Sequence, residues 1–183
     1  MKTESTALYV ARLAVTLLLI TALVAALLAG VNSITKPAIE ALKAQKTQAA
    51  IAAVLPGGGE EMTDFPATAL VSKVYASDLG YAVEVLPGGF DNTITMMVGI
   101  DKEGNILGID IISHTETAGL GAVAAAGTPA GEAFRGGFVG KTGSVSVTKD
   151  GGTLDAITGA TITSRAICAG VNAALDCVAG LLG

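Results

Sequence analysis

The sequence predicts an α+β domain attached to a membrane by an N-terminal helix, and three patterns in its 183 residues carry this prediction. An uncharged apolar run at residues 13–31 is long enough to form a transmembrane helix. Between residues 69 and 113, apolar and polar residues alternate in runs joined by short turns, as in an antiparallel sheet. At residues 162–182 the apolar residues recur at helical spacing, so we expect a long helix packed on the sheet.

Residues 13–31 read LAVTLLLITALVAALLAGV and contain only two polar side chains, both threonines. As a helix they would extend about 28 Å, close to the hydrocarbon thickness of a bilayer. A cleaved signal peptide is the alternative, but its apolar region would be shorter, and the small-x-small cleavage pattern is poor here. We therefore expect an uncleaved single-pass anchor in the lipid bilayer. Its direction does not follow from charge, because basic residues lie on both sides of it.

A second helical pattern follows the anchor and predicts a stalk over residues 32–59. Pro37 suits the first turn of a helix, and apolar residues recur from Ile39 to Leu55. The Pro-Gly-Gly-Gly sequence at 56–59 is expected to end this helix and to act as a hinge. The folded domain would then occupy residues 60–183.

Within that domain the pattern predicts four strands in a meander, then short helices, a further strand and a long final helix. The short connections between the first four strands make an antiparallel sheet the expectation. The expected ranges are 69–75, 81–86, 93–100 and 106–113 for the meander, 122–138 for the short helices, 144–148 for the further strand, and 162–182 for the final helix.

Composition excludes some classes of function. Beyond Lys46 the chain carries six basic residues against fourteen acids, so it has no basic stripe that could neutralise nucleic-acid phosphates. The single His and the absence of a CxxC pattern argue against a zinc or iron–sulfur site. Cys168 and Cys177 lie nine residues apart in the expected final helix, too far along its axis for a disulfide, and are expected to be buried thiols.

The segment from Asp155 to Arg165, D-A-I-T-G-A-T-I-T-S-R, is where we expect chemistry. It reads as a strand end, a turn of small residues and a helix start rich in hydroxyl groups. Free N–H groups and the helix dipole at such a start suit an anion such as a phosphate. Ordinary helix capping by a hydroxyl side chain is the alternative.

This segment resembles the recognition sequence of FMN-binding domains, Asp-x-x-(Ser/Thr)-Gly-Ala-Thr, in which the flavin is joined through its phosphate to the last Thr. All five fixed positions match, and the Ile-Thr-Ser that follows also fits the family. The resemblance implies covalent FMN on Thr161 and a phosphate turn shaped by the residues around it. The matching residues are Asp155, Thr158, Gly159, Ala160 and Thr161, followed by Thr163 and Ser164.

A second segment, from His114 to Gly121, resembles the H-x-E-T-P-G-L-G loop that lies near the flavin in this family. Ala118 replaces the usual Pro, which makes the loop slightly less rigid and should not abolish binding. The pattern G-I-D-x-x-G-x-(I/V)-x-G at residues 99–108 also resembles the family's central strands. The loop residues that the resemblance places near the flavin are His114, Glu116, Thr117, Gly119, Leu120 and Gly121.

The resemblance covers nearly the whole chain and is best with the G subunits of Rnf ion-translocating electron-transport complexes; the NqrC subunits of sodium-pumping quinone reductases are the alternative. It implies that residues 1–12 are cytoplasmic and that the domain lies outside the cytoplasm, at the cell (inner) membrane. It also implies that an ApbE-type flavin transferase attaches the FMN. The other subunits would complete a complex that passes electrons between ferredoxin and NAD while moving Na⁺ or H⁺.

Several roles stay open at this stage. Asp155 would orient the turn, serve recognition by the transferase, or cap the backbone. Glu116 and Thr117 would hydrogen-bond the flavin, or Glu116 would be a solvated loop carboxylate. His114 would tune the flavin, relay a proton, or more simply anchor its loop. No catalytic acid–base pair is expected, because the cofactor carries the redox chemistry and the protein binds and orients it.

Two further functions compete with the relay. An apolar helix that runs into a stalk is also how a pilin-like filament protein is built, although the cleavage site and early Glu of such proteins are missing. A flavin-bearing sensor or assembly module without electron-transfer turnover is the other possibility.

Overall fold

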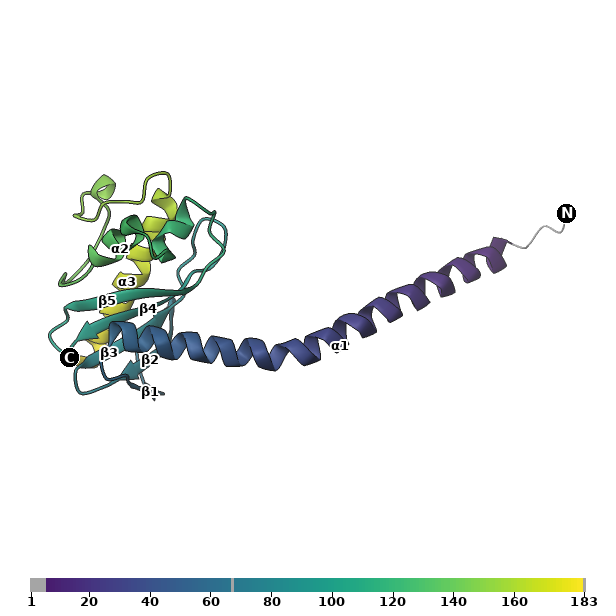
Figure 1. Ribbon diagram of the computed structural model, residues 1–183, viewed down its shortest axis with the longest axis horizontal. Coiled ribbons are helices and arrows are strands. Elements are labelled where there is room, and N and C mark those ends of the chain that lie inside the picture. Colours follow the sequence, from purple (N-terminus) through teal and green to yellow (C-terminus); the bar gives the residue numbers. More distant parts are fainter. Residues whose placement is uncertain (1–5, 67, 183) are drawn as a thin grey trace. The chain divides into compact units, whose positions relative to one another are not determined.

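The structure is a computed structural model that describes residues 6–66 and 68–182 (Figure 1). It contains two compact units, one that ends at Gln45 and one that runs from Lys46 onward. Within the described residues, the first consists of helix alone. The second contains the sheet and the remaining helices.

Helix α1, Thr6–Val54, begins before the expected anchor and continues through the expected stalk. Its part from Leu8 onward is long and apolar enough to cross a membrane, and none of its most apolar stretch is buried in the protein. The expectation that a separate helix starts at Pro37 is wrong, because Pro37 lies inside α1. A proline at this position removes one backbone hydrogen-bond donor, but the remaining hydrogen bonds of a long helix can keep the chain helical on both sides of it.

The last turns of α1 belong to the folded domain. Ala50, Ile51, Val54 and Leu55 are buried against apolar side chains of the sheet. A Cβ atom on Gly99 would collide with the Val54 carbonyl oxygen, so only glycine allows this close approach. The compact unit therefore starts ahead of residue 60, where we expected the domain to begin.

The sheet has five strands in the order β1-β2-β3-β4-β5, and every neighbouring pair is antiparallel. The four strands expected from the alternating pattern are confirmed, and the short edge strand β1 was not expected. The strands are β1 Glu60–Met62, β2 Val71–Ala76, β3 Gly80–Val85, β4 Thr95–Asp101 and β5 Ile106–Ser113.

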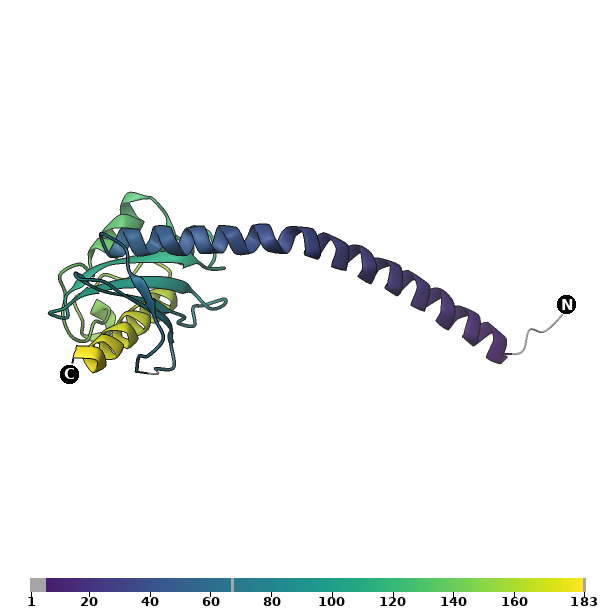
Figure 2. The same cartoon turned by 90° about the horizontal axis from the view of Figure 1, so that it is seen from below.

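The two faces of the sheet bury different elements. Successive side chains of a strand point to opposite faces, and in β4 Met97 packs with the end of α1 whereas Met96 and Val98 pack with the C-terminal helix. That helix is α3, Thr161–Leu182, which Figure 2 shows on the side of the sheet opposite the end of α1. α3 is also apolar enough to span a membrane, but 44% of its most apolar stretch is buried, as in a core helix.

The connection between β5 and α3 contains the 3₁₀ turn η1, Gly121–Ala125, and the helix α2, Pro129–Gly136. The expectation of a strand at 144–148 is wrong. Only Val147 forms a bridge, to Leu154, and the chain then enters the 3₁₀ turn η2, Thr148–Asp150. Both cysteines are buried and free, as expected.

Candidate functional site

A cavity of about 280 Å³ lies where the start of α3 meets two loops and the η2 turn. It gathers much of both sequence segments singled out above, although they are separated by more than thirty residues along the chain. The residues that line it are Phe90, Glu116, Thr117, Leu120, Gly121, Lys149, Gly159, Ala160, Thr161, Ile162 and Thr163.

Thr161 is the first residue of α3, and its side chain is half-buried at the edge of this cavity. The turn that places it needs Gly159, whose φ of 78° lies in the left-handed region that favours glycine. A Cβ on Gly159 would also come within 2.9 Å of the Leu120 side chain. The N–H of Ser164 donates to the Ala160 carbonyl and forms the first hydrogen bond of α3. The N–H groups of residues 161–163 come before this bond and point out of the N-terminal end of the helix.

Of the hydroxyl groups beside Thr161, two are used within the protein. Thr163 is 1% exposed and donates to a carboxylate oxygen of Glu116. Ser164 is fully buried; its hydroxyl donates to the Ala160 carbonyl and accepts from the N–H of Ile157. The Thr161 hydroxyl oxygen accepts from the Lys149 ammonium at 3.2 Å, and this contact leaves the hydroxyl hydrogen unused.

Glu116 is buried and connects three segments. Its Oε1 accepts from the backbone N–H groups of Phe90, at 2.9 Å, and Asp91, at 3.2 Å. Its Oε2 accepts from the Thr163 hydroxyl at the start of α3. Both oxygens are therefore engaged by protein donors, and the carboxylate holds the loop after β3, the loop after β5 and α3 together.

Two glycines make room for this carboxylate. A Cβ on Gly89 would collide with Glu116 Oε1. A Cβ on Gly121 would lie 2.5 Å from Glu116 Oε2 and 2.6 Å from Thr163 Oγ. The glycine in each loop is thus required by the close approach of the two loops to a buried charge.

The η2 turn presents a cation, Lys149, next to Thr161. Asp150 accepts from Arg165 on α3 in a bidentate pair, with Nε to Oδ2 at 2.7 Å and Nη2 to Oδ1 at 2.6 Å. These hydrogen bonds from Arg165 lower the pKa of Asp150. Thr161 and Arg165 lie one helical turn apart on the same face of α3. The ion pair between Asp150 and Arg165 therefore also holds Lys149, the neighbour of Asp150, at Thr161.

Three apolar side chains stand exposed around the cavity: Phe90 at 66%, Ile162 at 52% and Leu120 at 43%. They come from three different segments and line the same cavity as Thr161. A planar aromatic ligand could lie against such side chains while a phosphate group reaches the helix start.

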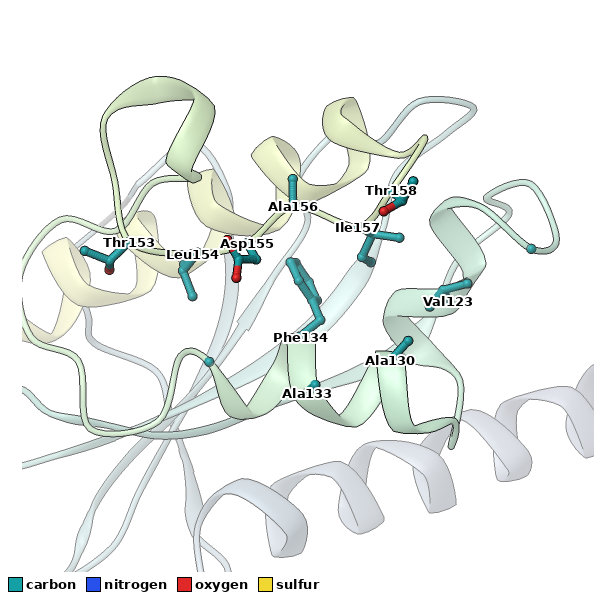
Figure 3. Close-up of a pocket in the computed structure, with 12 residues that line it drawn as sticks. Val123, Ala130, Ala133, Phe134, Thr153, Leu154, Asp155, Ala156, Ile157 and Thr158 are labelled. Carbon is teal, nitrogen blue, oxygen red and sulfur yellow. The ribbon is translucent and has the colours of Figure 1, made fainter.

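Several residues expected at the site lie next to this cavity. Gly119, Asp155 and Thr158 line a neighbouring cavity of about 460 Å³, which is built around Phe134 of α2 (Figure 3). His114 lines neither cavity, and its Nδ1 is buried without a hydrogen-bond partner among the described residues.

The sequence patterns did not assign a role to Phe90 or Lys149. Phe90 follows two glycines in a loop, and an aromatic residue in such a turn is a signal that could have been used. Lys149 stands in a polar turn that resembles many others, so no local signal could have singled it out.

Comparison with known proteins adds the family. Residues 89–176 match the model of the FMN-binding domain. The chain is 33% identical to the G subunit of the ion-translocating oxidoreductase complex of Methanosarcina acetivorans, over 95% of this chain and 97% of that protein. It is 30% identical to the G subunit of the Na⁺-translocating ferredoxin:NAD⁺ oxidoreductase complex of Acetobacterium woodii, over 90% of this chain and 89% of that protein.

A third relative, the G subunit of the proton-translocating ferredoxin:NAD⁺ oxidoreductase complex of Clostridium ljungdahlii, is 35% identical over 57% of this chain and 56% of that protein. The similarity to the first two relatives extends over nearly the whole chain, and the match to the FMN-binding domain includes the Thr161 cavity. The chain therefore belongs to the family of G subunits of ion-translocating oxidoreductase complexes and carries that family's FMN-binding domain.

Proposed function

We propose that this protein is an electron-relay subunit that carries FMN bound covalently, through its phosphate, to Thr161. It would act within a membrane complex that couples electron transfer between ferredoxin and NAD to the movement of Na⁺ or H⁺. The names of two relatives support this role, since both belong to ferredoxin:NAD⁺ oxidoreductase complexes. One complex is named for Na⁺ and the other for protons, so the family does not fix the ion.

The observation that carries the proposal is the state of the Thr161 hydroxyl. Thr161 lines the cavity and is half-buried, whereas the Thr163 and Ser164 hydroxyls are buried and hydrogen-bonded within the protein. Its partner, Lys149, is a cation that donates to it, so the oxygen is next to a positive charge and its hydrogen is free to leave. These are the properties needed by an oxygen that forms a phosphodiester.

The cavity also suits a flavin. Phe90, Leu120 and Ile162 would contact the faces and edges of an aromatic ring, and the start of α3 would face the phosphate. At about 280 Å³ the cavity is just below the roughly 300–1,000 Å³ usual for small-molecule sites, so part of the ring would project from it. FMN supplies reversible electron transfer when bound. A projecting ring edge would let a neighbouring protein of the complex approach it.

The other residues of the two segments take supporting roles in this proposal. Glu116 and Thr163 hold the loops, Gly121 gives Glu116 room, and Gly159 and Ala160 form the turn before Thr161. Thr117 and Gly119 belong to the turn that presents Leu120, whose N–H donates to the Thr117 carbonyl. Asp155 and Thr158, which face the second cavity, are left to recognition by the flavin transferase.

For topology we propose a single span at residues 13–31, with residues 1–12 in the cytoplasm and the FMN-binding domain outside it, at the cell membrane. The exposed apolar side chains along this part of α1 support a lipid environment. A filament protein without flavin has no support from the family to which the chain belongs.

The proposal is tested by co-expressing the chain with an ApbE-type flavin transferase and recording flavin fluorescence in a denaturing gel. The parent and Thr161→Ser should fluoresce, because both keep the hydroxyl, and Thr161→Ala should be dark. Thr142→Ala removes an exposed threonine outside the motif that ends in Thr161. It is the matched control and should fluoresce. A dark parent, with the transferase active on another substrate, would show that this chain carries no covalent flavin.

A further inference from the structure

The Lys149 side chain is a cation held at the reacting atom by the fold. Its ammonium lies 3.2 Å from Thr161 Oγ, and no other basic residue lines the cavity within the described part of the chain. The sequence segments typical of the family do not include it, since it lies in the turn before Asp155. Resting on the proposed function, we propose that Lys149 is the counter-ion of the flavin phosphate, both while Thr161 is being loaded and in the finished phosphodiester.

The turn that carries Lys149 is closely fixed. The Thr148 N–H donates to the Leu154 carbonyl at 2.8 Å, and the Gly152 N–H donates to the Val147 carbonyl at 3.0 Å. Gly151 closes the turn with a φ of 84°. Since the neighbouring Asp150 is paired with Arg165 of α3, the turn is held at both its base and its tip.

The positive charge of Lys149 suits a phosphate ligand at Thr161. A phosphodiester carries one negative charge, and the carboxylate that also lines the cavity, Glu116, is engaged by two backbone N–H groups and the Thr163 hydroxyl. Among the ion pairs that the described residues form, none involves Lys149. Its ammonium has three donors and gives one to Thr161, so two remain for phosphate oxygens.

The loading step needs a flavin nucleotide activated by a pyrophosphate bond. A bond forms between Thr161 Oγ and the flavin-side phosphorus, and the P–O bond to the rest of the nucleotide breaks. With flavin adenine dinucleotide, adenosine monophosphate leaves with the bonding electron pair, and the hydroxyl proton passes to a base of the transferase or to water. Lys149 keeps its protons and stabilises the charge that builds on the phosphoryl oxygens.

The test measures how fast purified transferase loads the detergent-solubilised full chain with flavin adenine dinucleotide. Lys149→Met should slow loading about ten-fold, the size of one charge-assisted hydrogen bond at a partly exposed site. Lys149→Arg should restore most of the rate, and the control Lys102→Met, in an exposed turn, should load like the parent. Raising the salt concentration should slow the parent more than Lys149→Met, because salt screens exposed charges.

A second measurement follows the finished linkage. The phosphorus NMR signal of the loaded protein should shift between the parent and Lys149→Met, and should stay in place for Lys102→Met. Loading of Lys149→Met at the parent rate, or an equal slowing in Lys149→Arg, would overturn the counter-ion role while the flavin on Thr161 stands. A parent that takes no flavin from an active transferase would overturn the proposed function and this inference together.

Discussion

The Thr161 cavity is lined by one buried carboxylate, Glu116, and by one exposed cation, Lys149. Glu116 accepts hydrogen bonds from Phe90, Asp91 and Thr163, so its two oxygens are engaged by the protein. Lys149 donates one hydrogen bond to Thr161, and its ammonium has two further N–H donors for a ligand. The carboxylate thus joins segments of the fold, while the cation is available to a ligand.

This difference explains how an acidic domain can receive a phosphate. The hydrogen bonds to Glu116 hold its carboxylate against protein donors, and Lys149 supplies a positive charge beside Thr161. Substitutions on the Glu116 side should therefore act first on stability. Substitutions on the Lys149 side should act first on the loading of flavin.

The largest effect on stability is expected for Glu116→Ala. It leaves two backbone N–H groups without their acceptor, at roughly 1–3 kcal/mol each, so we expect a loss of about 2–6 kcal/mol in the free energy of unfolding. Urea denaturation of the detergent-solubilised chain, followed by tyrosine fluorescence, measures it, since the chain has no Trp. Glu103→Ala, in an exposed turn, is the control and should stay within about 0.5 kcal/mol of the parent. Equal values for the two variants would show that Glu116 does not hold the loops.

A smaller effect is expected for Gly121→Ala. The added methyl group would lie 2.5 Å from Glu116 Oε2, and the forced shift should cost about 1–3 kcal/mol of stability. The same denaturation experiment measures it. Gly127→Ala, where a Cβ meets no atom within 4 Å, serves as the matched control. Parent-like stability in Gly121→Ala would mean that the loops adjust freely around the carboxylate.

The smallest effect on stability is expected for Arg165→Gln, because its ion pair with Asp150 is exposed. Flavin loading should nevertheless slow, since the turn that positions Lys149 loses its partner on α3. The pKa of Asp150 is lowered by Arg165, so the pair's contribution is present above the usual aspartate pKa and is lost as pH falls through the lowered value. If Arg165→Gln had the same loading rate and the same acid stability as the parent, the positioning role of the pair would be contradicted.

The sheet could be predicted from the sequence because alternation and short turns are local signals. Strand β1 escaped because it has only three residues, and the expected strand at 144–148 failed because η2 turns the chain away after a single bridge. The docking of α1's end was also missed. Apolar residues such as Ile51 and Val54 fit a stalk as well as a core, and only the sheet's position decides between them.

The candidate site was predictable where its residues follow one another along the chain. The motif that ends in Thr161 and the loop that contains Glu116 could be found in this way, although the hydrogen bonds that engage Glu116 could not. Phe90 and Lys149 reach the cavity from separate turns, through pairings that form only when the chain folds. The aromatic residue after two glycines is a weak local signal for Phe90, whereas nothing in the local sequence marks Lys149.

Every role proposed for the cavity depends on a phosphodiester between FMN and Thr161, and peptide mass spectrometry of the loaded full chain can detect that bond. We expect the peptide containing Thr161 to gain the mass of one FMN less one water, with fragmentation placing the gain on Thr161. A gain on Thr158, Thr163 or Ser164, or flavin that leaves the protein on denaturation, would contradict the proposed linkage.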